Sequence, residues 1–320
     1  MLHLKNKKVL VTGGHGFLGS WVVKELENRG AQHVFAPSSK QCDLRTLAGC
    51  KKAVVGQDIV VHIAARVGGI GLNKKYPGQL FYNNAVMGIH LLEEARQAGV
   101  SKMLIIGTAC SYPKNSPVPF VEKNLWDGYP EEVTGMYGMA KKMLLVQAQA
   151  YRQEYGLNTI YIIPVNLYGP GDHIDPAYGH VLPSLIRKVV DAKKQNKKEV
   201  VVWGTGRATR EFLYVEDAAC GIVDALIHYD QSEPVNLGTG QEISIKKLVM
   251  LLKKHLGYTG KIVWDSTKPD GQRRRSMDIR NARKHFGFNA KTSLDDGLDK
   301  TIEWFLKETA PNRACNPLAV

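Results

Sequence analysis

Short apolar runs alternate with longer segments in which apolar residues recur every three or four positions through the first half of the chain. Short runs closed by glycine or other small residues are typical of buried strands, and the longer amphipathic segments are typical of helices. We expect strands at residues 8–12, 34–36, 58–63, 103–106 and 159–163, and helices at residues 17–29, 79–98 and 137–155. This alternation predicts an α/β fold with a doubly wound parallel (Rossmann-like) sheet, whose chemistry lies at the carboxyl ends of the strands.

The pattern loosens after Pro164. We expect a loop at residues 168–171, helices at 182–194, 216–228 and 244–256, and a strand at 200–203. The helix at 216–228 is expected to return to the first domain. We therefore predict a dinucleotide-binding domain at residues 1–165, rejoined by about 208–235, and a smaller, mostly C-terminal substrate domain at residues 166–320.

A glycine-rich turn follows the first expected strand and opens the first expected helix. Its sequence is Gly13-Gly14-His15-Gly16-Phe17-Leu18-Gly19. Glycines at this spacing allow a tight turn and close backbone approach, and the helix N-terminus favours a pyrophosphate. The turn therefore predicts dinucleotide binding, although a glycine-rich turn can also be purely structural.

The end of the second expected strand bears on the choice of dinucleotide. NAD enzymes usually place an acid there to bind the ribose hydroxyls. This chain instead has Pro37-Ser38-Ser39-Lys40, whose hydroxyls and cation suit a 2′-phosphate. We therefore favour NADP(H), and the alternative is a polar surface turn with Asp43 near the adenine.

Tyr137 and Lys141 form a Tyr-xxx-Lys pair on an expected helix. This spacing places the phenol and the ammonium on one face, one turn apart. A nearby ammonium favours the phenolate, so we expect it to lower the tyrosine pKa toward neutrality and make Tyr137 a proton donor or acceptor at a carbonyl oxygen. Together with the glycine-rich turn, the pair indicates a nicotinamide-dependent enzyme.

Several further segments give the chain a resemblance to the extended short-chain dehydrogenase/reductases, and within them to the GDP-L-fucose synthase family of GDP-4-keto-6-deoxymannose 3,5-epimerase/4-reductases. They are Val67-Gly-Gly-Ile70, Gly107-Thr-Ala-Cys-Ser-Tyr-Pro-Lys114, Pro164-Val-Asn-Leu-Tyr-Gly-Pro170, Gly179-His-Val-Leu-Pro183, Val202-Trp-Gly-Thr-Gly206, Arg210-Glu-Phe212 and Lys268-Pro-Asp-Gly271. Cys110 and His180, in their contexts, separate this family from ordinary sugar-nucleotide epimerases.

The resemblance implies that the substrate is a GDP-linked 4-keto-6-deoxy sugar. The C4 ketone acidifies the protons on C3 and C5, so a base and an acid flanking the ring can invert both centres. Cys110 fits the base and His180 the acid. In the reduction of the ketone that follows, Tyr137 protonates the C4 oxygen, Lys141 lowers the tyrosine pKa and holds the nicotinamide ribose, and Thr108 hydrogen-bonds the C4 oxygen.

The resemblance also assigns binding residues. At the nucleotide end of the substrate, cations, an aromatic plane and a carboxylate for guanine donors are expected at Lys188, Trp203, Arg210 and Asp270. Besides the glycine-rich turn and the turn after the second strand, the cofactor is expected to contact Ala64, Ala65, Ile106, Gly107, Lys141, Pro164, Asn166, Leu167 and His180. Asn166 serves either the backbone or the nicotinamide.

Two positions depart from the family pattern. Thr108-Ala109 stands where the family usually has Ser followed by Ser or Thr, and the β-branch of threonine restricts its rotamer. His15 lies where some members carry an arginine for the cofactor phosphate. The NADP preference therefore depends mainly on Ser38, Ser39 and Lys40.

Composition narrows the remaining classes. The formal net charge is +13, but lysines and arginines are spread out without interleaved aromatics, so we expect an anionic small molecule and no nucleic acid. No apolar run reaches membrane-span length, and we expect neither a membrane nor a metal. The five cysteines have no metal-ligand spacing and suit a reducing cytoplasm. By the resemblance, helices 79–98 and 137–155 are expected to form a homodimer contact.

Two alternatives stay open at this point. An epimerase that uses NAD transiently, without net reduction, would not need Cys110 and His180 and would do better with an acid after the second strand. A redox-sensing or RNA-binding protein on a dinucleotide fold would not need the pair of Tyr137 and Lys141.

Overall fold

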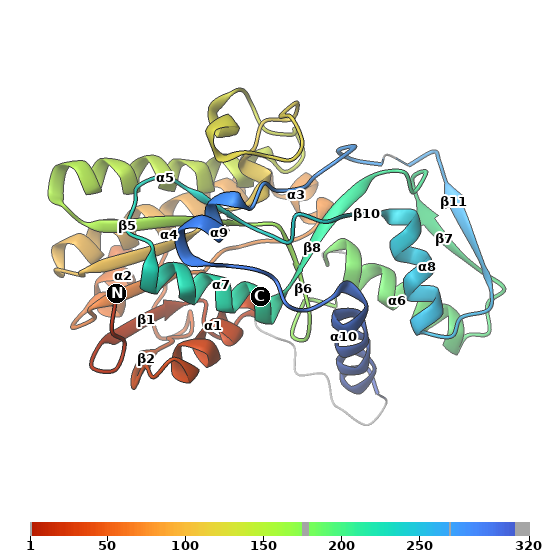
Figure 1. The fold of residues 1–320 in the computed structure, drawn as a ribbon, viewed down its shortest axis with the longest axis horizontal. Coiled ribbons are helices and arrows are strands. Elements are labelled where there is room, and N and C mark those ends of the chain that lie inside the picture. The colour runs from red at the N-terminus through yellow and green to blue at the C-terminus, as the bar shows by residue number, and fades with distance from the viewer. Residues whose placement is uncertain (1, 175–178, 269, 311–320) are drawn as a thin grey trace.

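A six-stranded sheet forms the larger part of the molecule in a computed structural model that describes residues 2–174, 179–268 and 270–310 (Figure 1). The strand order is β2-β1-β3-β4-β5-β9, and every neighbouring pair is parallel. The strands are β1 (Lys8–Thr12), β2 (His33–Phe35), β3 (Ile59–His62), β4 (Lys102–Ile106), β5 (Asn158–Pro164) and β9 (Val235–Leu237). The predicted fold class is confirmed.

Helices cover both faces of this sheet because its strands are apolar on both sides. On one face α4 (Pro77–Gln97) packs against α2 (Leu47–Val54) and α5 (Gly135–Tyr155). On the other, α7 (Val215–His228) packs against α1 (Phe17–Asn28) and α9 (Arg280–Phe286). The core of this layer includes fully buried apolar residues of all four central strands.

A second group of elements lies beside the sheet, to the right in Figure 1. It contains α6 (Val181–Lys194), α8 (Ile245–His255) and α10 (Leu294–Glu308), with the strand pair β7 (Glu199–Trp203) and β11 (Lys261–Asp265). These elements share their own apolar cluster, which includes Leu185, Leu248 and Phe305. The division of the chain at residue 165 stays a prediction, and the return to the larger sheet is made by α7 and β9.

Three short strands join the two parts. β8 (Thr209–Tyr214) pairs with β6 (Asn166–Tyr168) on one side and with β10 (Glu242–Ser244) on the other. Tyr168 was expected in a loop, and that expectation is wrong because its backbone pairs with Tyr214. The sequence pattern also missed β8 to β11, α2, α3 (Ile70–Lys75), α9 and α10, and it placed the bounds of other elements one or two residues away.

Glu211 is the polar centre of this junction. Its side chain is fully buried. One carboxylate oxygen accepts from the backbone N–H groups of Thr239 and Gly240. The other accepts from the Ser276 hydroxyl and from the backbone N–H of Met277. A buried carboxylate is tolerated when its lone pairs are filled in this way. Glu211 therefore fixes the segment that carries residues 270–277 against β8.

Replacing Glu211 by Gln is expected to lower the free energy of unfolding by about 2–3 kcal/mol, because an amide NH₂ group would face two N–H or O–H donors. Urea unfolding followed by circular dichroism measures this change. Glu303→Gln removes an exposed ion pair with Lys307 and is the control, with an expected change below about 0.5 kcal/mol. Equal changes in the free energy of unfolding for the two substitutions would contradict the role of Glu211 in holding residues 270–277 against β8.

None of the helices in the described ranges has the length and apolar character needed to cross a membrane.

Candidate active site

The glycine-rich turn joins β1 to α1, and its first and last residues pack closely against each other. Gly13 adopts a φ of +71°, a left-handed conformation that favours glycine, and its carbonyl accepts from the N–H of Gly16 at 2.9 Å. A Cβ on Gly19 would lie 2.0 Å from the Gly13 carbonyl oxygen. The turn therefore requires glycine at both ends, and no bulkier side chain fits this approach of helix to strand.

The N-terminus of α1 suits a diphosphate. Its N-cap is Gly16, and no side chain caps the helix. The first N–H groups of the helix are therefore available as donors to a ligand. His15 and Gly16 are exposed, Phe17 is half-buried, and Leu18 points into the core. The turn thus offers the donors and the space that a dinucleotide pyrophosphate needs.

The residues after β2 offer hydroxyls and a cation. Ser39 and Lys40 are exposed, and Ser38 is bonded through its N–H and hydroxyl to the Gln41 side-chain oxygen. Asp43, the acid closest in sequence, is engaged by a bidentate ion pair with Arg45. An anionic phosphate therefore meets no free carboxylate within the turn itself.

The carboxyl ends of β1, β3, β4 and β5 meet at one edge of the sheet, since Thr12 pairs with His62, His62 with Ile105, and Ile106 with Ile162. The expected cofactor positions that follow these strands therefore lie along one edge: Ala64, Ala65, Ile106, Gly107 and Pro164. Leu167 and Asn166 belong to β6, and the Asn166 amide donates to the Glu211 carbonyl at 2.9 Å. Of its two open roles, Asn166 therefore has the backbone one here.

Thr108, Cys110 and Tyr137 lie together beyond β4. Thr108 caps the short 3-10 turn η1 (Ala109–Ser111), where its hydroxyl accepts from the Cys110 N–H at 3.2 Å. The phenol of Tyr137 is hydrogen-bonded to the Thr108 side chain. Gly138 makes this approach possible, because a Cβ there would lie 2.2 Å from the Cys110 carbonyl oxygen.

The pKa of Tyr137 is raised, and the expected lowering toward neutrality is wrong. Burial of the phenol is the largest cause, followed by the charge of Cys110, while the hydrogen bond with Thr108 acts in the opposite direction. Lys141 is itself buried, which lowers its pKa to about 8. Loss of hydration therefore dominates, and the phenol of Tyr137 stays protonated at neutral pH.

Lys141 points toward the carboxyl end of β3. Its charge, after burial, is the second cause that lowers the pKa of His62, which is bonded to the Thr12 hydroxyl at 2.9 Å. The Lys141 backbone is held by the Tyr161 hydroxyl, which donates to its carbonyl. The backbone of Lys141 is thus anchored to β5, which carries Tyr161.

His180 lies at the start of α6, apart from this group. Its Nδ1 is 3.3 Å from a carboxylate oxygen of Asp172, which is buried. Burial lowers the pKa of His180, but the hydrogen bond and the charge of Asp172 outweigh it, and the net shift is upward. Among the described residues, no hydrogen bond or ion pair joins His180 to Cys110 or Tyr137, and residues 175–178 lie outside the described ranges.

Asp172→Asn is expected to lower the pKa of His180, because the neutral amide keeps the burial and removes the charge that favours imidazolium. A raised pKa keeps a histidine protonated to higher pH, so the variant should lose the proton at lower pH than the wild type. NMR titration of the imidazole, assigned with His180→Gln, measures the midpoint. An unchanged midpoint would contradict the role of Asp172, and the exposed His33 is the internal reference.

The residues expected at the nucleotide end form a connected row. The ammonium of Lys188 lies 5.3 Å from the centre of the Trp203 ring, and Trp203 is 63% exposed. Asp270 accepts from the N–H and hydroxyl of Thr205, two residues after Trp203. Arg210 donates to the backbone carbonyls of Thr209 and Gln272, which places it beside the Asp270 segment.

Arg210 connects this row to the cysteine. Its pKa is lowered to about 10, first by burial and then by the charge of Arg275, against the charges of Asp270 and Cys110. Charge interactions therefore run from Asp270 through Arg210 to Cys110. Residues in this order offer cations and an exposed aromatic ring at one end, and a thiol and a phenol at the other.

Sequence reasoning missed two residues of this site. Arg275 donates to the Cys110 sulfur although the two are 165 positions apart. Asp172 contacts His180, eight positions later in the chain. No spacing rule links either Arg275 or Asp172 to its partner.

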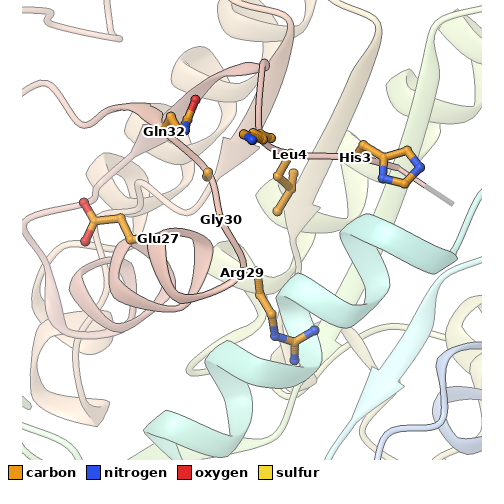
Figure 2. Close-up of a pocket in the computed structure, with 8 residues that line it drawn as sticks. His3, Leu4, Glu27, Arg29, Gly30 and Gln32 are labelled. Carbon is orange, nitrogen blue, oxygen red and sulfur yellow. The ribbon is translucent and has the colours of Figure 1, made fainter.

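A separate hollow lies at the opposite edge of the sheet (Figure 2). It is formed by residues before β1 and between α1 and β2: His3, Leu4, Lys5, Glu27, Arg29, Gly30, Ala31 and Gln32. Arg29 is paired there with Glu25 and Asp224. Because these residues lie at the amino ends of the strands, they take no part in the site described above.

Comparisons with known proteins agree with this geometry. Residues 9–238 match the model of the NAD dependent epimerase/dehydratase family. The chain is 39% identical to GDP-L-fucose synthase 1 of Arabidopsis thaliana, covering 95% of this chain and 94% of that protein. It is 32% identical to GDP-L-fucose synthase of Escherichia coli, over 95% of this chain and 98% of the relative.

Solved structures give the same result. A GDP-L-fucose synthetase from Naegleria fowleri bound to NADP superimposes with a TM-score of 0.86 at 29% identity, covering 95% of each chain.

Proposed function

Because this chain belongs to the NAD-dependent epimerase/dehydratase family, and within it to the GDP-L-fucose synthases, we propose that it converts GDP-4-keto-6-deoxy-D-mannose to GDP-L-fucose with NADPH. The exposed aromatic ring of Trp203 beside Lys188, with Arg210 farther along, suits a guanosine diphosphate. The glycine-rich turn and the acid-free turn after β2 suit NADP(H). When bound, that cofactor supplies a hydride for C4 of the sugar.

Epimerisation is assigned to Cys110 and His180. The C4 ketone makes the protons on C3 and C5 acidic, and the thiolate of Cys110 removes such a proton while the electron pair moves to the ketone oxygen. His180, kept protonated by Asp172, returns a proton to carbon from the other face. Each cycle leaves one centre inverted and both side chains ready for proton exchange with water.

The reduction of the ketone is assigned to Tyr137 and Thr108. Their hydrogen bond directs both hydroxyl groups to one place at the carboxyl edge of the sheet. Because burial keeps the phenol protonated, Tyr137 donates its proton to the C4 oxygen as that oxygen gains negative charge. The nearby Lys141 ammonium stabilises the tyrosinate that this step leaves.

The observation that carries the proposal is that the turn holding Cys110 packs against the helix that holds the reductase tyrosine. A Cβ on Gly138, next to Tyr137, would lie 2.2 Å from the Cys110 carbonyl oxygen, and the charge of Cys110 contributes to the raised pKa of Tyr137. A transient NAD epimerase needs the tyrosine alone, and a nucleotide sensor needs neither group. An epimerase-reductase needs both, on one ligand.

The test is a reaction with GDP-4-keto-6-deoxymannose and NADPH in deuterium oxide, followed by absorbance and by mass spectrometry of the sugar. We expect one NADPH oxidised per product and solvent deuterium at C3 and C5. NADH in place of NADPH is the cofactor control and should give a lower kcat/KM. Product without solvent deuterium at C3 and C5 would reject the epimerase half, and absence of NADPH oxidation would reject the reductase half.

We further propose that the enzyme works in the cytoplasm as a homodimer built on α4 and α5. The two helices pack against each other, and the Gln147 amide of α5 donates to the Ile89 carbonyl of α4. Large apolar residues stay exposed on the same pair of helices: Phe81, Tyr82, Ile89, Val146 and Tyr155. Joining two copies of this face would form a four-helix contact that removes the apolar surface from water.

Sedimentation at micromolar concentration is expected to give twice the mass of one chain. Val146→Glu should shift the protein to monomer, because the substitution would bury a charge in the contact. Met250→Glu is the matched control, since Met250 is equally exposed on α8 in the second group of elements. A monomeric wild type, or a control that dissociates to the same extent, would reject this interface.

A further inference from the structure

Arg275 directs its guanidinium at the sulfur of Cys110. Its Nη1 donates to Cys110 Sγ at 3.6 Å, and its Nε donates to the Gln272 side-chain oxygen at 3.1 Å. The next two residues, Ser276 and Met277, are tied to the buried carboxylate of Glu211. The guanidinium therefore approaches the thiol from an anchored segment and is held at both its Nε and Nη1 atoms.

The preceding arginines have different contacts. Arg274 is paired with the carboxylate of Glu242. The backbone carbonyl of Arg273 accepts a hydrogen bond from the N–H of Thr209. Within the described ranges no carboxylate forms an ion pair with Arg275. Its positive charge is therefore available to the sulfur, which makes Arg275 different from its neighbours.

Three other groups face Cys110 from the elements packed around it. Thr108 of the same turn accepts the Cys110 N–H through its neutral hydroxyl. Tyr137 of α5 stays protonated, because the charge of Cys110 adds to burial in raising the pKa of the phenol. Arg210 of β8 brings a second positive charge, since the charge of Cys110 favours its protonated form. Of the groups that face the sulfur, Arg275 and Arg210 are positively charged, and Thr108 and Tyr137 are neutral.

We propose that Arg275 is a positioning residue that holds Cys110 as a thiolate and so prepares it as the base for epimerisation. The proposal rests on the role of Cys110 given above. A thiol must lose its proton before it can accept one from carbon, and a guanidinium that donates to the sulfur stabilises the negative charge. When the C–H bond breaks, the proton joins the sulfur and the negative charge passes to the ketone oxygen of the sugar.

The thiolate state also separates the tasks of the two reacting side chains. Negative charge on Cys110 disfavours a second negative charge on Tyr137, so the phenol keeps its proton while the cysteine acts as the base. Arg275 therefore supports the base directly and the acid indirectly. The two groups are kept in opposite protonation states within one small site.

The test measures the rate of alkylation of Cys110 by iodoacetamide in the substrate-free enzyme from about pH 5 to about pH 10, by mass spectrometry of the Cys110 peptide. Iodoacetamide is neutral, so the arginines do not attract it as they would an anionic reagent. The rate rises with the thiolate fraction, so the midpoint of the pH–rate profile reports the ionisation of Cys110. An opposite charge beside an ionisable group shifts its pKa by about 1–3 units, and we therefore expect Arg275→Gln to raise the midpoint by about that much.

The controls separate charge from structure. Arg275→Lys keeps a cation and should restore most of the wild-type midpoint, whereas Arg274→Gln should give the wild-type profile. Above the ordinary thiol pKa of about 8.5, Arg275→Gln should reach a plateau at least as high as that of the wild type, because a thiolate of higher pKa is the stronger nucleophile. An unchanged midpoint in Arg275→Gln, or a rate that stays low at every pH, would overturn the proposal.

This experiment also distinguishes failure of the inference from failure of the proposed function. Alkylation is measured without any sugar nucleotide, so it reports the state of the sulfur whatever the substrate is. An enzyme that fails to process GDP-4-keto-6-deoxymannose could still show the dependence on Arg275. Conversely, an active epimerase with unchanged alkylation in Arg275→Gln would reject the role of Arg275 alone.

Discussion

Tyr137→Phe is expected to reduce NADPH oxidation by about 10²- to 10⁴-fold, the usual contribution of a general acid. The substitution removes one hydroxyl and with it the proton for the C4 oxygen and the hydrogen bond with Thr108. The glycine-rich turn and Lys141 are unchanged, so NADPH binding measured by fluorescence should stay near the wild-type value. The loss should therefore appear in kcat.

The control for this prediction is Tyr129→Phe. Tyr129 is exposed and lies in the same stretch of chain, where its backbone carbonyl accepts from the N–H of Lys114. Removing its hydroxyl leaves that bond in place and should not change turnover. A Tyr137→Phe enzyme that keeps more than about half of the wild-type turnover would show that another group supplies the proton.

Cys110→Ser is expected to abolish solvent deuterium exchange at C3 and C5, because a serine hydroxyl is a far weaker acid than a thiol and does not provide an anionic base. Tyr137 and Lys141 stay in place, so the C4 ketone can still be reduced without inversion. Mass spectrometry of the product formed in deuterium oxide measures both results in one sample. The expected product carries the hydride at C4 and no solvent deuterium at C3 or C5.

His180→Gln should fail in a different way. Deprotonation by Cys110 can still occur, but the proton that must arrive from the other face is missing. Exchange should therefore persist while inversion stalls. If both residues only contact the substrate, each substitution would slow exchange, inversion and reduction to the same extent, and this common slowing would contradict their assignment as base and acid.

Most regular elements of the first 165 residues could be predicted because local rules determine them; the short helices α2 and α3 were missed. Each central strand is a short apolar run between glycines or small residues, and each helix repeats apolar residues at helical spacing. The turn at Gly13 is equally local, since its conformation and its contact with Gly19 involve residues six positions apart. For such features the sequence alone was sufficient, and the family comparison agrees with it.

The second half was harder because its strands are short and depend on distant partners. β6, β9 and β10 contain three residues each, too few for a periodic pattern to be recognised. β6 is a strand because its backbone pairs with β8, more than forty positions away in the chain. Tyr168 therefore looked like part of a loop, although the register with Tyr214 places it in a strand.

Protonation states were decided by tertiary structure alone. Spacing puts Lys141 one turn from Tyr137, and this predicted a lowered tyrosine pKa. The fold buries the phenol and adds the charge of Cys110, and both effects raise its pKa. Burial depends on every element around the site, so no motif can report it.

Some site residues could be found from short motifs, whereas others reach the site only through the fold. Tyr137, Lys141 and Cys110 were found because they lie in short motifs, where neighbours in sequence are neighbours in space. Arg275 acts on Cys110, and Asp172 on His180, from other positions in the chain, and Glu211 anchors the two residues that follow Arg275. Sequence determined which reactive groups are present, whereas tertiary structure decided which charges surround them, because electrostatic interactions depend on distance in space and on exclusion of water.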